Sequence, residues 1–177
     1  MSSLTIHASS GRLSLFALPL LLAALLPAAA SGAAEGELEK VGEARLKVMF
    51  WSIYDSRLYM PDGRYEPGKR PLRLELQYLR DIPSKELVKR TGKEWDGLGV
   101  PKEKQDGWME KLESLWPDIS ENDVLTLDLD DDNHASFHHN GDYLGTIEDA
   151  EFGQNFIDIW LSPEGSRPEM RTALIGN

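Results

Sequence analysis

Residues 49–63 read MFWSIYDSRLYMPDG, a stretch in which aromatic rings alternate irregularly with charged side chains. Apolar residues recur with a period of two before this stretch, and their phase changes inside it. One extra residue exchanges the two faces of a strand, so we predict one bulged strand over residues 45–60. A strand buried on both faces would give the same pattern. The positions concerned are Leu46, Val48 and Phe50 before the change, and Trp51 and Ile53 after it.

The next segment, LRLELQYLR at residues 72–80, alternates regularly between apolar and polar side chains. The turn sequence PDG at 61–63 separates it from the first strand. This pattern predicts an antiparallel partner strand with one buried face and one face in water. The residues on the buried face are Leu72, Leu74, Leu76 and Tyr78.

The period then changes to that of helices. Residues 82–99 predict a helix capped by Ser84, and residues 100–118 predict a second helix that Pro117 ends. Three short strands follow, with the tight turn Asn140-Gly141 before the last, and two helices complete the chain. The order of strands, helices, strands and helices predicts an α+β fold, with helices on one face of an antiparallel sheet. The later ranges are 123–130, 134–139 and 142–147 for strands, and 148–161 and 166–176 for helices.

The N-terminal segment has the pattern of a secretory signal. Arg12 precedes an apolar run over residues 13–27, and small residues follow it. We expect residues 1–33 to be this signal, cleaved between residues 30 and 34, and residues 34–177 to form one exported domain in the periplasm. The run is shorter than the roughly 20 residues of a membrane-spanning helix, which argues against the alternative of an uncleaved anchor. We expect no integral membrane segment after the signal is removed.

The composition narrows the classes of function. The chain carries 30 acidic against 19 basic residues and a net charge of −11, so its surface repels nucleic acid. It contains no cysteine, which excludes disulfides, thiol catalysis and thiolate metal sites. No phosphate loop, dinucleotide fingerprint or nucleophile elbow is present, and we expect no cofactor. The oligomeric state and any protein partner stay open.

Two polar clusters resemble metal sites only superficially. Residues 128–134, DLDDDNH, have the first ligand spacings of a calcium loop, but Asn133 replaces the required glycine. We therefore interpret this segment as a solvated hairpin tip. His138 and His139 point to opposite sides of a strand and are poorly placed to bind one zinc ion. We expect no metal site.

Three blocks of the sequence resemble the bacterial exported branch of the chalcone isomerase-like family. They are VGEARLKVMFWSIYDSRLYMPDGRY, LELQYLRDI and FHHNGDYLGTIEDAEFGQNFIDIWLSPEGSRPEMRTALIG, which together extend over residues 41–176. The resemblance implies an open-faced β-sandwich, in which helices are layered on one side of a large antiparallel sheet. The family includes plant isomerases that close a flavanone ring, and also non-catalytic members, some of which bind fatty acids.

The resemblance also implies where the catalytic positions of the isomerases would fall. Arg45 and Lys111 match the basic residues of the isomerases. The other four positions have lost a hydroxyl or amide, and their apolar or bulkier replacements remove donors from the cleft. This difference argues against the isomerase reaction. The four replacements are Tyr54, Trp108, Leu115 and Phe152.

Three functions remain open from the sequence. The first is a non-catalytic domain that binds a small apolar carboxylate or phenolate such as a fatty acid. The second is a structural or partner-binding module with a filled core, and the third is an intramolecular lyase of the chalcone isomerase type. A ligand would place its tail beside the helix at 104–116 and its head on an arginine. The predicted ligand-binding residues are Arg45, Tyr54, Tyr78, Trp108, Lys111, Leu112 and Phe152.

Overall fold

The structure is a computed structural model, and it describes Met1 and residues 38–176. The predicted signal segment and its cleavage point lie outside the described residues. Among the residues that are described, no helix is both long and apolar enough to cross a membrane.

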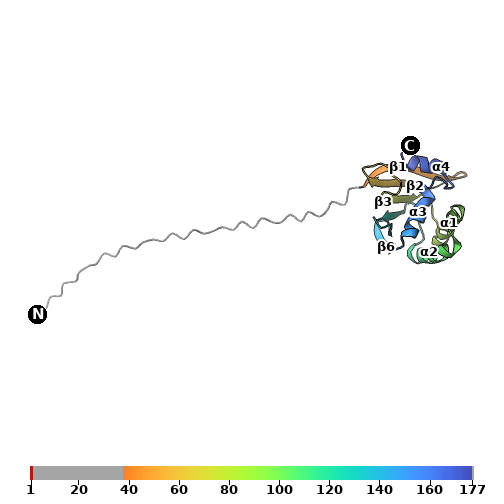
Figure 1. The fold of residues 1–177 in the computed structure, drawn as a ribbon. Coiled ribbons are helices and arrows are strands. Elements are labelled where there is room, and N and C mark those ends of the chain that lie inside the picture. Colours follow the sequence, from red (N-terminus) through yellow and green to blue (C-terminus); the bar gives the residue numbers. More distant parts are fainter. Residues whose placement is uncertain (2–37, 177) are drawn as a thin grey trace. The chain divides into compact units, whose positions relative to one another are not determined.

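Within residues 38–176, six antiparallel strands form one sheet whose spatial order follows the chain, β1-β2-β3-β4-β5-β6 (Figure 1). Two helices are inserted between β3 and β4, and two more follow β6. The predicted α+β fold with its antiparallel sheet is therefore confirmed. The strands are β1 (Leu38–Val48), β2 (Trp51–Pro61), β3 (Leu72–Tyr78), β4 (Val124–Leu129), β5 (Ala135–His139) and β6 (Asp142–Ile147). The helices are α1 (Ser84–Gly97), α2 (Lys102–Leu115), α3 (Ala150–Leu161) and α4 (Pro168–Leu174).

The predicted single strand over residues 45–60 is wrong. The chain reverses at Met49 and Phe50, so that Val48 pairs with Trp51 in a β1–β2 hairpin. Met49 has a φ of +55°, a conformation that tight hairpin turns usually give to glycine or asparagine. A methionine and a phenylalanine give no sequence signal for a turn. The phase change of the apolar residues therefore marks a chain reversal, although β1 also contains register shifts nearby.

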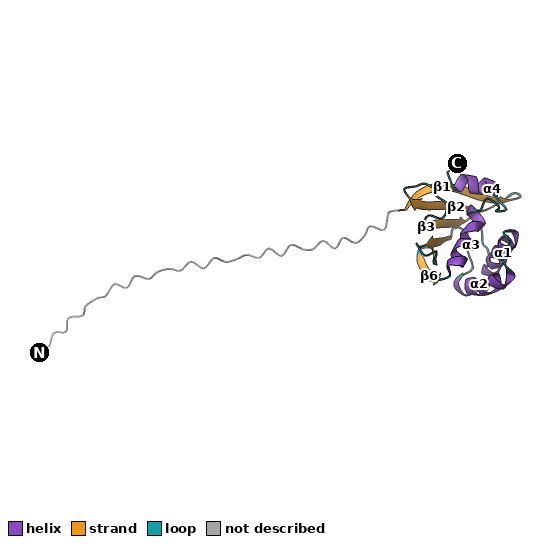
Figure 2. Ribbon diagram, in the orientation of Figure 1, coloured by secondary structure: helices purple, strands orange, loops and turns teal. Residues whose placement is uncertain are grey.

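The sheet has one buried face and one polar face, as the alternation along residues 72–80 predicts. Leu74 on β3 pairs with Leu127 on β4, and both side chains are buried. On the opposite face Arg73 donates from Nε to Asp128 Oδ1 at 2.7 Å. All strands thus offer their apolar side chains to the same side, and the helices must gather there. Figure 2 shows α1, α2 and α3 on one side of the strands.

An aromatic cluster joins the helices to the sheet. Trp95 of α1 lies 5.4 Å from Trp108 of α2 and 6.0 Å from Phe152 of α3, measured between ring centroids. Edge-on contacts of this kind add to the free energy of burying the rings. The cluster consists of Trp95, Trp108, Trp116, Phe137, Phe152 and Phe156.

Asp149 connects this cluster to the start of α3. Its Oδ1 accepts from the backbone amides of Glu151 and Phe152, and its Oδ2 accepts from Trp108 Nε1 at 2.9 Å. The indole donor of Trp108 and the two amides lower the pKa of the Asp149 carboxyl, although partial burial opposes them. Ser84, by contrast, is the first residue of α1 and does not cap it, because Pro83 holds the cap position without a side-chain bond.

We predict that Asp149→Ala lowers the free energy of unfolding by about 2–3 kcal/mol, because α3 loses its cap and Trp108 its partner. Urea denaturation followed by circular dichroism measures this loss. Because folding lowers the pKa of Asp149, its carboxylate stabilises the folded state at any pH above the pKa that it has in the unfolded chain. This stabilisation is lost as the pH falls through the pKa that it has in the folded state. Asp131→Ala, at an exposed turn position, is the control and should change little. Equal midpoints for the two variants would contradict the assigned role.

Candidate functional site

The helix layer leaves an apolar cavity of about 290 Å³ between the sheet and helices α1, α3 and α4. This volume is close to the roughly 300 Å³ at which small-molecule sites begin. Its floor comes from the first four strands and its roof from the three helices. The floor residues are Leu46, Ile53, Tyr54, Leu76, Tyr78 and Leu125, and the roof residues are Leu87, Thr91, Phe156, Ile159, Trp160 and Met170.

Two tyrosines bring hydroxyl groups into this apolar lining. Tyr54 and Tyr78 lie opposite each other on β2 and β3, with ring centroids 5.7 Å apart. The Tyr54 hydroxyl accepts from Trp160 Nε1 at 3.0 Å, and its own proton has no acceptor among the described residues and can be donated to a ligand. Burial raises the pKa of Tyr54 to about 12 and also raises the pKa of Tyr78. Both phenols are therefore neutral hydrogen-bond donors at physiological pH.

Trp116, whose side chain also lines the cavity, has an indole Nε1 that is buried and forms no hydrogen bond within residues 38–176. A buried N–H group without a partner costs about 1–3 kcal/mol. Such groups are normally satisfied by protein, ordered water or a ligand. The cavity lining thus contains a hydrogen-bond donor, the indole N–H of Trp116, that no described residue accepts.

Charged residues from α1 and from the segment before α4 surround the mouth of the cavity. Arg90 forms an ion pair with Glu94, and Ser166 Oγ donates to the same carboxylate at 2.7 Å. Arg167 also lines the cavity, and its guanidinium forms no ion pair among the described residues. After burial and the Trp160 hydrogen bond, the charge of Glu94 acts to raise the pKa of Tyr54, and the charges of Arg167 and Arg90 act to lower it. The mouth therefore carries charges of both signs, and Arg167 is a cation there that forms no ion pair among the described residues.

The structure places only two of the predicted site residues, Tyr54 and Tyr78, in the cavity lining. Arg45 lies on the opposite face of the sheet, where it donates to both carboxylate oxygens of Asp55 at 2.6 and 2.7 Å. Its side chain is half exposed. The expected position of Arg45 is thus corrected, because Leu46 points to the helices and alternation turns Arg45 away.

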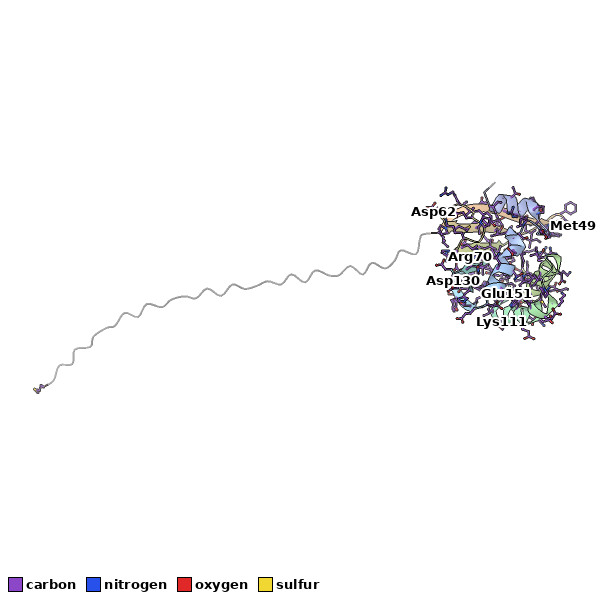
Figure 3. The ribbon with its side chains drawn as sticks, viewed as in Figure 1. Met49, Asp62, Arg70, Lys111, Asp130 and Glu151 are labelled. Atoms are coloured by element: carbon purple, nitrogen blue, oxygen red, sulfur yellow. The ribbon has the colours of Figure 1, made fainter. Side chains whose placement is uncertain are left out.

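The other four predicted residues lie away from the cavity. Trp108, Leu112 and Phe152 are buried in the core beneath α2 and α3, where neighbouring rings fill the space. Lys111 is exposed on α2, and Figure 3 labels it at the surface of the domain. The space expected between the central strand and helix α2 is therefore filled, and the cavity lies under α1, α3 and α4.

Sequence reasoning missed Thr91, Trp160 and Arg167, which come from three different elements of the roof and mouth. One available signal is the breadth of the apolar surface of α3, where Phe152, Phe156, Ile157 and Leu161 are all buried. A helix with so wide an apolar surface contacts more than one interior region. Nothing in the local sequence marks Arg167, because its position depends on how the last helix returns to the sheet.

The histidines and aspartates considered for metal binding form separate pairs. His134 Nδ1 lies 3.2 Å from Asp130, and His139 Nε2 lies 2.9 Å from Asp123. Within the described part of the chain, no three ligand-type side chains converge on one point.

The arrangement suits binding better than bond making. The walls are apolar, neutral phenols and an indole offer hydrogen bonds, and a cation lies at the mouth. These features match a molecule with an apolar tail and an anionic or polar head. The carboxylates of the lining are Glu86 and Glu94, and Glu94 is held by Arg90 and by the hydroxyl of Ser166.

Comparison with known proteins agrees with this architecture. An uncharacterized protein of Haemophilus influenzae is 29% identical over 139 residues, which cover 78% of this chain and 68% of that protein. A crystal structure of a fatty-acid binding protein of Arabidopsis thaliana superposes with a TM-score of 0.61 at 12% identity, covering 79% of this chain and 87% of that one. This second match shows a shared fold. Residues 28–176 match the family described as chalcone isomerase-like, and the chain belongs to that family.

Proposed function

We propose that this protein binds a small amphipathic acid such as a fatty acid and does not convert it. The observation that carries the proposal is the apolar cavity with Arg167 at its mouth, a cation that forms no ion pair among the described residues. An apolar tail gains about 25 cal/mol for each Å² removed from water, and an arginine gives the head a charge-assisted hydrogen bond. The fatty-acid binding protein with the same fold supports this class of ligand.

The lining suggests how such an acid would lie. Its tail would contact Leu76 and Leu125 on the sheet and Phe156 on α3. Its carboxylate would lie at the mouth, where Arg167 supplies a positive charge. Tyr54 would favour the acid as well, since its raised pKa keeps the phenol neutral and able to donate. A phenolate at this position would instead repel a carboxylate.

The positions of two basic residues support a non-catalytic function over the isomerase alternative. Arg45 and Lys111 are the positions that match the basic catalytic residues of plant isomerases. Arg45 is held on the outer face by Asp55, and Lys111 is exposed on α2. Neither lines the cavity, so they do not meet around one substrate. The cavity also favours a ligand-binding domain over a purely structural module with a filled core.

We further propose that the protein is exported and acts in the periplasm. The support is the apolar run of residues 13–27 with its small-residue end. A periplasmic binding domain without cysteine depends on packing alone, which fits the aromatic cluster described above.

The first test of the binding proposal is calorimetric titration with a long-chain fatty acid. Wild-type protein should bind, and Arg167→Met should bind about ten- to a hundredfold more weakly, since a hydrogen bond to a charged group is lost. Arg45→Met is the matched control and should bind like wild type, because Arg45 lies on the other face of the sheet.

A fatty alcohol of the same length separates the head from the tail. It lacks the carboxylate, so wild type and Arg167→Met should bind it equally. Absence of fatty-acid binding by wild-type protein would refute the proposed function. Binding that is equal in wild type and Arg167→Met would remove Arg167 from the site.

A second prediction concerns the cavity itself. Thr91 lines it, and Thr91→Phe should fill it and weaken fatty-acid binding at least about tenfold, with the melting temperature largely retained. Thr172→Phe is a close control, because both threonines donate to the carbonyl four residues earlier in a helix. Thr172 is exposed and does not line the cavity. Full affinity in Thr91→Phe would place the ligand elsewhere.

A third prediction concerns export. Intact-mass analysis of protein isolated from an exporting host should find a mature chain that begins between residues 31 and 34. The physical reason is that a signal peptidase recognises the small residues that follow the apolar run. A mature chain that still begins at Met1 would contradict the proposal.

A further inference from the structure

The β1–β2 hairpin ends in a group of exposed apolar side chains. We define the hairpin tip as Val48, Met49, Phe50 and Trp51, which are 41%, 85%, 95% and 64% exposed. Such exposure of neighbouring large apolar residues is unusual on a domain whose other apolar side chains are mostly buried. Figure 3 labels Met49 at the end of the hairpin, where it projects from the domain.

The backbone holds this tip in place. Met49 has a positive φ, and Val48 and Trp51 pair directly across the turn. Folding therefore orders the hairpin up to its last residues without burying them. The domain gains nothing from the apolar character of Phe50 in water, so the residue type is explained better by something that covers it.

The tip is continuous with the cavity. Val48 belongs to both, and Leu46 and Ile53, on the same hairpin, line the cavity wall. The exposed apolar surface thus leads from the end of the hairpin to the mouth at which Arg167 lies. A surface that covered the tip would also lie against this mouth.

The extent of the tip argues against a protein partner. A stable protein interface buries about 800 Å² and 20–30 residues on each side. The only other large apolar side chain of residues 38–176 with comparable exposure is Tyr143, which belongs to β6 at the other edge of the sheet. A small projecting group of this kind is better suited to insertion among lipid chains than to a broad contact.

The side chains around the tip match the boundary region of a bilayer. Trp51 and Phe50 have the ring types that bind at the interface between headgroups and acyl chains. The guanidinium of Arg80 lies 5.2 Å from the Trp51 ring centroid, and Lys47 is exposed beside Val48. These two cations lie where lipid phosphates would meet them. The net charge of −11 opposes a strongly anionic membrane and favours zwitterionic headgroups.

We propose that the hairpin tip inserts into a lipid surface of zwitterionic headgroups and brings the cavity mouth to the membrane. Met49 and Phe50 enter the acyl region, Trp51 lies at the boundary, and Lys47 and Arg80 contact the phosphates. This docking does not require that the cavity be filled. If the cavity takes fatty acids, the same contact gives them a route that avoids water.

The absence of cysteine allows a site-specific test in the full-length chain. Phe50→Cys and Tyr143→Cys each carry one environment-sensitive fluorophore, and phosphatidylcholine vesicles are titrated into each protein. We expect a blue shift and a gain of emission at position 50 and none at position 143. Both variants keep residues 13–27, so an effect of that segment on vesicle binding is common to them.

A second substitution tests the apolar contribution. Met49→Glu, added to the labelled Phe50→Cys protein, should raise the vesicle concentration for half-maximal emission change at least about tenfold. No emission change at position 50, or the same change in the presence and absence of Met49→Glu, would overturn the proposal. A shift that depends on protein concentration and not on vesicles would assign the tip to a second copy and also overturn it.

The two proposals fail separately. Thr91→Phe, introduced into the labelled protein, should weaken fatty-acid binding at least about tenfold and leave the vesicle response unchanged. If that variant lost the vesicle response, the emission change at position 50 would depend on an open cavity and not on insertion of the hairpin tip. That result would overturn the proposal.

Discussion

The alternation of side chains across β3 and β4 is the constraint from which the rest of the structure follows. Each strand places leucines on one face and charged residues on the other, and the pairing of Leu74 with Leu127 keeps the two faces in register. A shift of one residue would bury Arg73 and Asp128. The charged side chains of the polar face pair with one another, as Arg73 does with Asp128, and they remain in contact with water. The helices therefore cover only the apolar face. Every candidate interior site must therefore lie between that face and the helices.

The position of the cavity follows from how the aromatic cluster fills this space. Six rings occupy the region beneath α1, α2 and α3, and their edge-on contacts leave little free volume there. Trp116 and Phe156 belong both to the cluster and to the cavity wall, so they mark the boundary between the filled and the open part. Beyond them, smaller roof residues such as Thr91 and the short helix α4 do not fill the volume above β1, β2 and β3.

Sequence patterns predicted most of the helices and strands, because the periodicity that marks each of them lies within a few consecutive residues. The alternation over residues 72–80 and the Asn140-Gly141 turn were sufficient to define their strands. The β1–β2 hairpin could not be predicted in the same way, since its turn residues Met49 and Phe50 are not turn formers. The error had a consequence for the site, because Arg45 on a single long strand had no obvious partner. On the hairpin, Asp55 stands directly opposite it.

The rest of the candidate site depended on tertiary contacts that no local pattern contains. Tyr78 was predicted from the alternation of its strand and Tyr54 from the family resemblance, and the structure places the two opposite each other on β2 and β3. Arg167 was missed because its place at the mouth depends on the turn between α3 and α4, and on the close approach of α4 to β1. At that approach a Cβ on Gly42 would lie 2.3 Å from the carbonyl oxygen of Ala173, so only glycine fits. Gly42 thereby fixes α4 against the sheet edge, and with it the cation at the cavity mouth.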